Sequence, residues 1–442
     1  MDKSDAHSKI IFEYSNLINM KRLKLKWLIL LAACGIDLVS VAQSTLKLEE
    51  CYKLAETNYP LVKQRELLAK SKEYSLDNIS RGVWPKLNIS GQATYQSDVT
   101  KLPISFPGVN IPTLSKDQYK LYGEVNQPIS ELFLVKDQKA LQEANSSIRQ
   151  ENLEVELYRL KDRINQLFFG ALMIDEQIRQ NELLKKDIQT GINRINAFIK
   201  NGTDFKVSLD KMSAELLKTK QHDIELTTSK RAYLDMLGLF LGKPMDEKVT
   251  LQKPQSVSLI AIVKRPELSI FDFQKKSYEM QNRLITAKNL PNVGLFFQGG
   301  TGRPSPVNML SNSLSPYYIG GVRLNWSLSG LYTYKKERRI VSIENDLLDA
   351  QKETFLFNTN LTLNQQNGEI NKLQELLKTD DQIVELRVSV KNTASVQLEN
   401  GVITTNDYLK EINAEDQARQ NRLLHEMQLL MAQYNYQNTS GN

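Results

Sequence analysis

Residues 83–96, VWPKLNISGQATYQ, decide the fold, because a proline that ends a helical stretch is followed directly by an alternating segment. The same arrangement returns as NLPNVGLFF at residues 289–297, where Pro291 stands 206 positions after Pro85 (291 − 85). Other pairs keep a near-constant interval: Pro60 and Pro266, Ser130 and Ser329, Gly202 and Gly401. Such an interval through most of the chain predicts an internal duplication of one unit of about 200 residues.

Four segments of the chain alternate between apolar and polar residues, which is the period of a strand with one apolar face. They lie at residues 87–96, 119–126, 293–297 and 318–326. The connections at residues 101–117 and 301–316 are long and rich in proline, serine and asparagine, as surface loops are. We therefore expect one strand pair in each repeat.

Two environments suit such strands. In a soluble protein, the four-stranded sheet would pack its apolar face on a helix. In an outer membrane, strands of about 9–11 residues span the bilayer, with aromatic residues where lipid meets water. The residues expected at these interfaces are Trp84, Tyr95, Tyr317, Tyr318 and Trp326. Because four strands cannot close a barrel and hydrocarbon tolerates no open strand edge, a membrane barrel would be shared among protomers.

Two long stretches without proline predict unusually long helices. Residues 132–201 contain only Gly170 and Gly191 as helix-weakening residues, so a near-continuous helix there would run about 100 Å. Residues 331–400 behave similarly. Within the first stretch, spacings of three and four residues predict a coiled-coil seam: Leu157, Leu160, Ile164, Leu167, Ala171, Ile174 and Ile178.

Each long helix ends at an Asn-Gly pair. Gly202 and Gly401 can adopt the left-handed conformation that caps a helix. A second helix is expected after each turn, over about residues 207–241 and 406–436. An amphipathic hairpin of this length buries too little apolar surface to be stable alone, so it must pack its stripe against neighbours. This argument again predicts an oligomer.

The N-terminal residues 1–42 predict export from the cytoplasm. Lysine and arginine residues precede the apolar run at residues 27–35, and a small-x-small pattern ends at Ala42, as at a signal-peptidase site. A second interpretation takes Leu-Ala-Ala-Cys as similar to a bacterial lipobox, with Cys34 lipidated after cleavage. A third is a buried helix that is never removed. Met20 is a natural start for the signal, as an alternative to the first methionine.

The rest of the chain is expected to hold one repeat at residues 43–250 and a second, with a C-terminal tail, at residues 251–442. Beyond the apolar run no segment of about 18 apolar residues occurs, so helical membrane spans are not expected. The net charge of +6 is mild, and no basic block indicates nucleic acid. The 3 histidines have no neighbouring ligand set, and no phosphate-binding glycine loop or Gly-x-Ser-x-Gly motif occurs. We expect no enzyme activity, metal or cofactor.

Taken in order, several motifs resemble the outer-membrane efflux family, the TolC-like channels, over about residues 45–437. The motifs are LKLEECYKLAETNYP at residues 46–60, the helix-to-strand junctions at 83–87 and 289–293, the strand-to-helix exits at 127–129 and 325–328, and the two Asn-Gly turns. The resemblance implies a mostly α-helical, internally duplicated homotrimer, in which twelve strands close one outer-membrane β-barrel and helical hairpins form a periplasmic tunnel. It also implies a passive exit duct for efflux or type I secretion, coupled through a periplasmic adaptor to an inner-membrane pump of the RND or ABC type.

The resemblance also implies functional residues near the turns. Those of the periplasmic tips, which would contact the adaptor, are Asn201, Gly202, Thr203, Asn400, Gly401 and Val402. Asp407 matches the first acidic residue that narrows the entrance in the family, whereas the second falls on Lys410, of opposite charge. A carboxylate that only favours the start of a helix is the alternative for Asp407. The family's entrance-lock residues fall on mostly apolar positions: Val207, Ser208, Leu398 and Ile403.

One other class of function fits the same features. An exported coiled-coil scaffold or adhesion protein would dimerise through the seams, and its strands would form a small soluble sheet. A detergent-extracted trimer with heat-modifiable migration favours the channel, whereas solubility without detergent favours the scaffold. The transported solute and the pump class stay open, because selectivity in the family resides mostly in the pump.

Overall fold

The computed structural model describes residues 45–99, 108, 113–247, 249–308 and 311–442. The predicted leader at residues 1–42, with Cys34, lies outside the described residues. Contacts divide the chain into two units, a small one and a large one. In the small unit, β1 (Thr45–Leu46) and β4 (Thr250–Leu251) form a two-stranded parallel sheet. The other elements belong to the large unit.

In the large unit, the order helix, two strands, long helix and returning helix occurs twice along the chain. The first series is α2 (Leu48–Asn58), η1 (Pro60–Val62), α3 (Lys63–Arg81), β2 (Lys86–Tyr95), β3 (Asp117–Pro128), α4 (Glu131–Tyr158), α5 (Leu160–Lys200) and α6 (Lys206–Leu241). The second is α7 (Glu267–Lys288), β5 (Asn292–Arg303), β6 (Ser315–Asn325), η2 (Leu328–Gly330), α8 (Leu331–Glu399) and α9 (Thr405–Ser440). The internal duplication itself stays a prediction.

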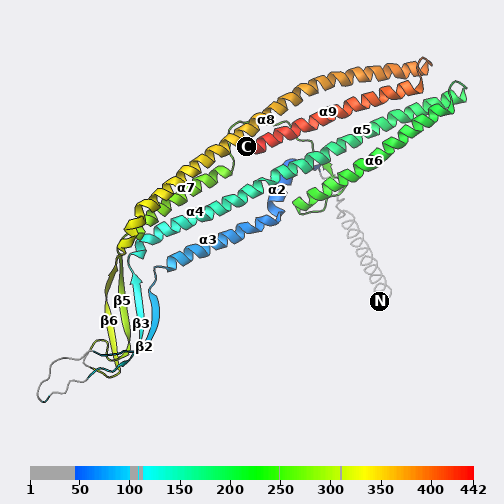
Figure 1. The fold of residues 1–442 in the computed structure, drawn as a ribbon. Coiled ribbons are helices and arrows are strands. Elements are labelled where there is room, and N and C mark those ends of the chain that lie inside the picture. Colours follow the sequence, from blue (N-terminus) through cyan, green and yellow to red (C-terminus); the bar gives the residue numbers. More distant parts are fainter. Residues whose placement is uncertain (1–44, 100–107, 109–112, 248, 309–310) are drawn as a thin grey trace, which may run out of the picture. The chain divides into compact units, whose positions relative to one another are not determined.

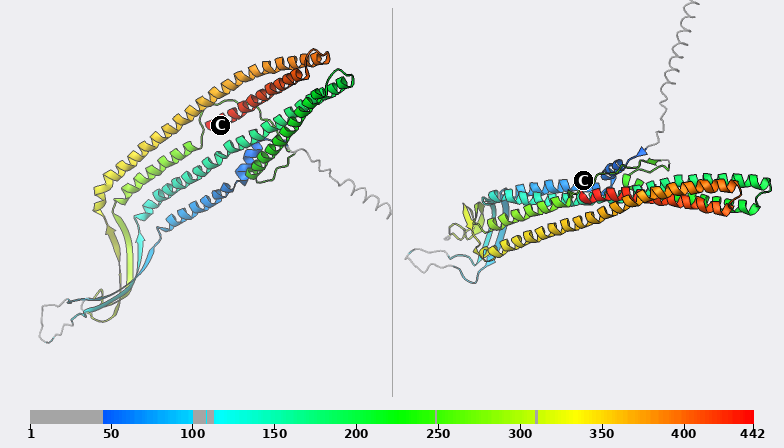
Figure 2. Two further views of the ribbon diagram at one scale, coloured as in Figure 1. Left: turned by 45° about the vertical axis from the view of Figure 1, so that its right-hand side comes forward. Right: turned by 90° about the horizontal axis from the view of Figure 1, so that it is seen from above.

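The helices of the large unit follow the order of the strands that they continue. Near the sheet, α3, α4, α7 and α8 lie side by side, and the strands lie in the order β2, β3, β5, β6 (Figure 1). Farther from the sheet, α5 packs against α6 and α9, and α9 packs against α8 (Figure 2). The hairpin of α5 and α6 therefore lies against the hairpin of α8 and α9.

The long helices are present as predicted, with one interruption. The helix expected over residues 132–201 is divided at Arg159, whose backbone nevertheless keeps right-handed helical angles (φ −63°, ψ −18°). The second long helix, α8, is continuous over 69 residues, which corresponds to about 100 Å. The returning helix α9 is longer than expected, because it continues to Ser440 and ends at Gly441, which has a φ of 86°.

The two hairpins share an apolar core. One cluster joins α5, α6 and α9 and consists of Ile188, Ile192, Ile195, Met212 and Leu409. A second joins α8 and α9 and consists of Ala394, Leu398, Tyr408 and Ile412. Leu184 packs against both. Glycine at position 191 allows Met212 to pack closely against α5, because an added Cβ would lie 2.2 Å from Cε of Met212.

The four strands form one antiparallel sheet, as expected, but one predicted connection is wrong at both ends. Residues 301–316 were expected to form a loop, whereas β5 continues to Arg303 and β6 begins at Ser315. Glycines at positions 299, 300 and 302 interrupt the alternation that identifies a strand in the sequence. Gly300 serves the sheet by leaving space, because a Cβ on it would lie 2.6 Å from Cβ of Tyr122 on β3.

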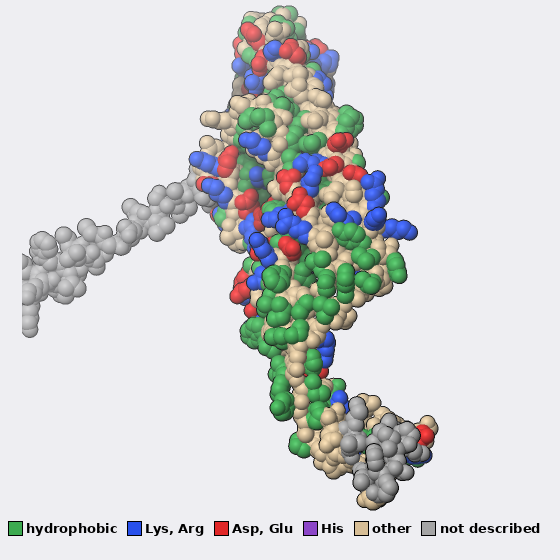
Figure 3. All heavy atoms as spheres, turned by 90° about the vertical axis from the view of Figure 1, so that its left-hand side faces the viewer, with side chains coloured by type: hydrophobic (Ala, Val, Ile, Leu, Met, Phe, Trp, Pro, Cys, Tyr) green, Lys and Arg blue, Asp and Glu red, His purple; other side chains and the backbone are tan. Residues whose placement is uncertain are grey.

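The register gives the sheet two different faces. The apolar face consists mainly of Leu87, Ile89, Tyr95, Tyr119, Leu121, Val125, Leu295, Phe297, Tyr318, Val322 and Leu324. Its side chains are exposed, reaching 86% for Ile89, and Figure 3 shows apolar side chains over the strands and the adjoining helices. The alternative of a sheet that packs this face on a helix of the same chain is therefore wrong for the described residues. Within those residues, no helix has the length and apolarity needed to cross a membrane.

Replacing Gly300 by alanine tests the close approach of β3 and β5. In Gly300→Ala, the added Cβ would lie 2.2 Å from the carbonyl oxygen of Leu121, so the backbones must separate. We expect a loss of about 1–3 kcal/mol of stability, measured as a lower temperature of unfolding. Gly299→Ala is the matched control, because the nearest atom to its Cβ, Cε1 of Phe297, is 3.8 Å away. Equal unfolding temperatures of the two variants would contradict this register.

Candidate functional site

The two hairpins end in turns of the same backbone geometry. Asn201 has φ −88° and ψ 2°, and Asn400 has φ −88° and ψ 3°. The following Gly202 and Gly401 are left-handed, with φ of 72° and 70°. This confirms the predicted glycine caps, because glycine adopts positive φ without a steric cost.

Backbone hydrogen bonds close each turn in the same way. Gly202 donates its N–H to the carbonyl of Ile199 at 3.0 Å, and Thr203 donates to Phe198 at 2.9 Å. The corresponding bonds of the second turn are Gly401 to Leu398 at 3.1 Å and Val402 to Gln397 at 2.8 Å. This is the Schellman arrangement, which satisfies the last carbonyls of a helix. The six residues predicted at the tips are all exposed: Asn201, Gly202, Thr203, Asn400, Gly401 and Val402.

Asp204 connects the two turns, which the sequence analysis missed. Its Oδ1 accepts from the N–H of Phe205 at 2.6 Å and from the hydroxyl of Ser208 at 2.7 Å, at the start of α6. Its Oδ2 accepts from the hydroxyl of Thr405, on the other hairpin, at 3.4 Å. The contacts with Phe205 and Ser208 are local in the sequence, whereas the contact with Thr405 depends on the fold.

Asp407 is held at the start of α9 by a capping box. Its N–H donates to Oγ1 of Thr404 at 3.2 Å, and its Oδ2 accepts from the N–H of Thr404 at 3.3 Å and from its hydroxyl at 2.7 Å. Nζ of Lys410 lies 3.2 Å from Oδ1. The hydrogen bond from Thr404, followed by that from Lys410, lowers the pKa of Asp407. The helix-start role considered for this carboxylate is therefore present in the structure.

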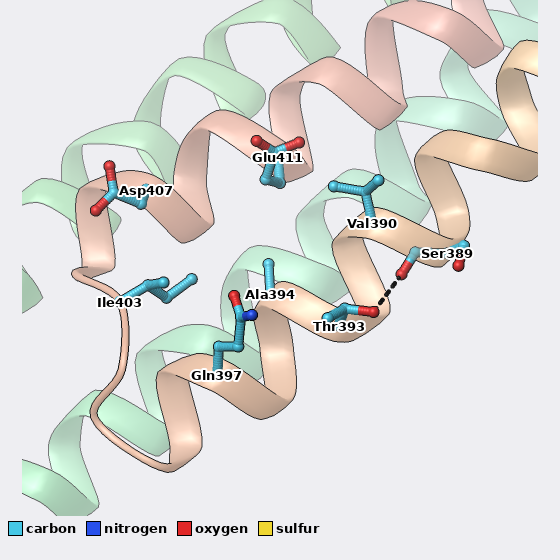
Figure 4. A pocket seen from close by; sticks show the side chains of 8 residues that line it. All are labelled: Ser389, Val390, Thr393, Ala394, Gln397, Ile403, Asp407 and Glu411. Carbon is cyan, nitrogen blue, oxygen red and sulfur yellow. Dashed lines mark hydrogen bonds between the residues drawn. The ribbon is translucent and has the colours of Figure 1, made fainter.

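A groove of about 330 Å³ between α8 and α9 brings Asp407 next to a second carboxylate. Its lining consists of Ser389, Val390, Thr393, Ala394, Gln397, Ile403, Asp407 and Glu411 (Figure 4). Asp407 and Glu411 are four residues apart and project from the same side of α9. The sequence analysis looked for the second acid only at Lys410 and so missed Glu411. The i, i+4 spacing was the available signal.

Ion pairs beneath the tips join both hairpins. Nζ of Lys391 on α8 lies 2.7 Å from Oδ2 of Asp187 on α5 and 3.5 Å from Oε2 of Glu415 on α9. Burial by itself lowers the pKa of Lys391, but the hydrogen bond to Asp187 and the two negative charges raise it overall. Arg419 also pairs with Glu415. Because a buried charge that loses its partner is costly, these contacts fix the hairpins relative to each other.

The four positions onto which the family's entrance lock falls lie in different surroundings. Leu398 belongs to the buried cluster of α8 and α9, and Ile403 packs against it. Ser208 donates to Asp204, and Val207 is exposed. In the described residues, the polar contacts between the hairpins include those of Asp204 and of the Lys391 network.

The five aromatic residues expected at membrane interfaces do not share one surface. Tyr95 and Tyr318 lie on the exposed apolar face, and Trp84 and Trp326 are exposed where strands join helices. Tyr317 lies on the opposite face and is only 6% exposed. Since consecutive side chains of a strand point to opposite faces, Tyr317 and Tyr318 cannot act together.

The described residues offer no cluster of three or more histidine, cysteine or acidic side chains that could hold a metal ion. Two of the histidines form single pairs instead. Nδ1 of His222 lies 3.4 Å from Glu225, and Nδ1 of His425 lies 2.6 Å from Asp380. His7 lies outside the described part of the chain.

No known family model and no curated protein matches this sequence, whereas solved structures do. The outer-membrane channel OprN matches with a TM-score of 0.65 over 89% of each chain, at 13% identity. The outer membrane protein VceC of Vibrio cholerae matches with a TM-score of 0.65 over 89% of this chain and 96% of its own, at 11% identity. The MtrE outer membrane channel of Neisseria gonorrhoeae reaches 0.64 over 89% of each chain, at 12% identity.

The chain has the fold of the outer-membrane channels. This finding confirms, at the level of the fold, the resemblance to the outer-membrane efflux family. The mostly helical architecture with a smaller sheet agrees with it.

Replacing the capping glycine of the second hairpin tests the turn. Gly401→Ala is expected to cost about 1–2 kcal/mol, because its Cβ meets no atom within 4 Å and only the left-handed backbone is strained. Gly368→Ala, in the middle of α8 and also without a neighbour within 4 Å, should instead stabilise the same hairpin by about 1 kcal/mol. Thermal unfolding of both variants measures the difference, and effects of equal sign would contradict the turn geometry.

Asp416 gives the stability of the hairpins a pH dependence. It is buried on α9 and accepts hydrogen bonds from Gln180 of α5 at 3.0 Å and from Gln420 at 2.7 Å. Burial raises its pKa above the ordinary value of 3.8. Folding thus favours the protonated form, and ionisation costs stability as the pH rises above that value. We expect Asp416→Asn to raise the unfolding temperature at about pH 7 but not at about pH 3, and an equal effect at both would refute this.

Proposed function

We propose that the chain forms the exit duct of a tripartite efflux or type I secretion system in a bacterial outer membrane, as a homotrimer. The sheet carries this proposal. Its strands of 10, 12, 12 and 11 residues match the length of about 9–11 that a tilted strand needs to cross a bilayer. One face is apolar and exposed, and the opposite face carries charged groups, as in a barrel with a polar lumen.

Three copies solve the problem of the sheet edges. In the described sheet, β2 and β6 are the edge strands. Hydrocarbon cannot satisfy the free N–H and C=O groups of an edge, so β6 of one copy would pair with β2 of the next and close a barrel of twelve strands. This pairing, repeated around a threefold axis, leaves no edge exposed.

The same arrangement would cover an apolar stripe on α8. This helix lies at one side of the helical layer and exposes Ile340, Ile343, Leu347, Phe357 and Leu361. The helix at the other side, α3, exposes Leu67 and Tyr74. A neighbouring copy that pairs β2 with β6 would bring α3 against α8, which would bury these side chains.

In this proposal the helices extend into the periplasm and the tips meet an adaptor. The exposed turns at residues 201–203 and 400–402, with the exposed ring of Phe205 beside the first, offer main-chain and apolar contacts to a partner. The duct is passive, and an inner-membrane pump of the RND or ABC type supplies the energy. The rival, a soluble coiled-coil scaffold, is disfavoured because its sheet would leave a large apolar face in water.

Conductance in lipid tests the proposal. The protein extracted in detergent is expected to be a trimer and to form ion-conducting pores in a planar bilayer. A water-soluble monomer without conductance would sink the proposal.

The same bilayers test the entrance. Three copies would place Asp407 and Glu411 around the pore, where carboxylates attract cations and bind divalent ions. The double variant Asp407→Asn, Glu411→Gln should weaken block by divalent cations about tenfold. The amide oxygen of asparagine can still accept a hydrogen bond from the N–H of Thr404, so the capping box is kept. Glu375→Gln, on the exposed surface of α8 and paired with Lys378, is the control that should leave block unchanged. Unchanged block in the double variant would contradict the entrance assignment.

A further inference from the structure

The polar face of the sheet carries one lysine without a carboxylate partner in the part of the chain that the structure describes. Lys120 of β3 lies opposite Gln92 of β2 and Gly302 of β5. The register places it on the same face as Glu124 and Arg323, away from the exposed apolar side chains.

The other charges of this face are paired. Nη1 of Arg323 lies 2.8 Å from Oε1 of Glu124. Lys86, at the helical end of β2, lies 2.9 Å from Oε1 of Glu131. Lys120 is therefore the charged residue of this face that takes part in neither of these ion pairs.

Aromatic rings hold the ammonium group of Lys120. Its Nζ lies 4.5 Å from the ring centroid of Tyr122 and 5.6 Å from that of Tyr317. The faces of such rings attract a cation but carry no opposite net charge. Gly300 pairs with both tyrosines in the register, and its missing Cβ leaves space beside Tyr122.

The chain that follows β5 covers part of the polar face beside Lys120. A Cβ on Gly302, its neighbour on β5, would lie 2.7 Å from Cγ of Pro306, so the chain after β5 folds back over the polar face on the row of Lys120. The hydroxyl of Tyr317 is buried and has no hydrogen-bond partner among the described residues. A cation and an unused donor thus lie close together.

We infer that Lys120 forms an anion-attracting ring in the lumen of the barrel, which favours solutes that carry carboxylate, sulfonate or phosphate groups. The inference rests on the proposed function, because only a closed barrel turns the polar face into a lumen. A threefold axis would place three such lysines around the pore. Rings of lysine or arginine favour anions in pores, and low-dielectric walls strengthen their potential.

Reversal potentials of the full-length protein in planar bilayers, under a potassium chloride gradient, test the ring. The permeability ratio of chloride to potassium should fall about twofold or more in Lys120→Gln and stay near the wild-type value in Lys120→Arg. Lys70→Gln is the matched control. It removes the same charge from an exposed lysine of α3 that pairs with Glu66 at 2.6 Å, and it should leave the ratio unchanged.

A second measurement uses a blocking anion. Inorganic pyrophosphate, a polyvalent anion, should reduce the current through the wild-type pore, and the Lys120→Arg pore should respond alike. Normal conductance with an unchanged ratio in Lys120→Gln, or no effect of pyrophosphate on the wild type, would overturn the ring and leave the duct standing. Absence of any conductance from the wild-type protein would overturn the proposed function, and the ring with it.

Discussion

The unpaired backbone groups along β2 and β6 constrain the whole large unit. In the proposed channel the apolar face would meet lipid, and lipid cannot form hydrogen bonds with a strand edge, so the edges would pair with those of further copies of the chain. The helices follow the order of the strands, namely α3, α4, α7 and α8. A second copy that paired with an edge strand would therefore also place one of its helices beside the outer helix of the first copy. In the proposed trimer, closure of the barrel and assembly of the helical wall would therefore occur together.

Away from the sheet, the helices are held by contacts within one chain. Apolar clusters around Ile195 and Ile412 fill the space between the two hairpins, and Lys391 joins three helices through Asp187 and Glu415. The acidic side chains near the tips are therefore carried by helices that are packed and paired within one chain. Asp407 has two roles, because its carboxylate takes part in the capping box of α9 and also lines the groove.

Much of this architecture was readable from the sequence, because alternation, absence of proline and Asn-Gly pairs are local signals. They predicted four strands, two long helices and two left-handed caps. Errors arose where tertiary contacts override local pattern: the glycines in the extension of β5 to Arg303 look like loop residues, although Gly300 leaves space for Tyr122 of a neighbouring strand. The contact of Asp204 with Thr405 was missed for a related reason, because it joins two hairpins, whereas Glu411 had a local signal in its i, i+4 spacing from Asp407. Tyr317 was misplaced because alternation was not applied to adjacent aromatic residues.

The matching turns at Gly202 and Gly401 have a consequence for whatever meets them. Their main-chain angles agree within a few degrees, whereas the side chains after the glycines differ, threonine in one and valine in the other. A ring of three chains would thus display six turns with the same backbone geometry, and the side chains after the glycines would alternate between threonine and valine. A binding partner that contacts only the main chain would find six equivalent sites. A partner that contacts the threonine or the valine side chain would find three.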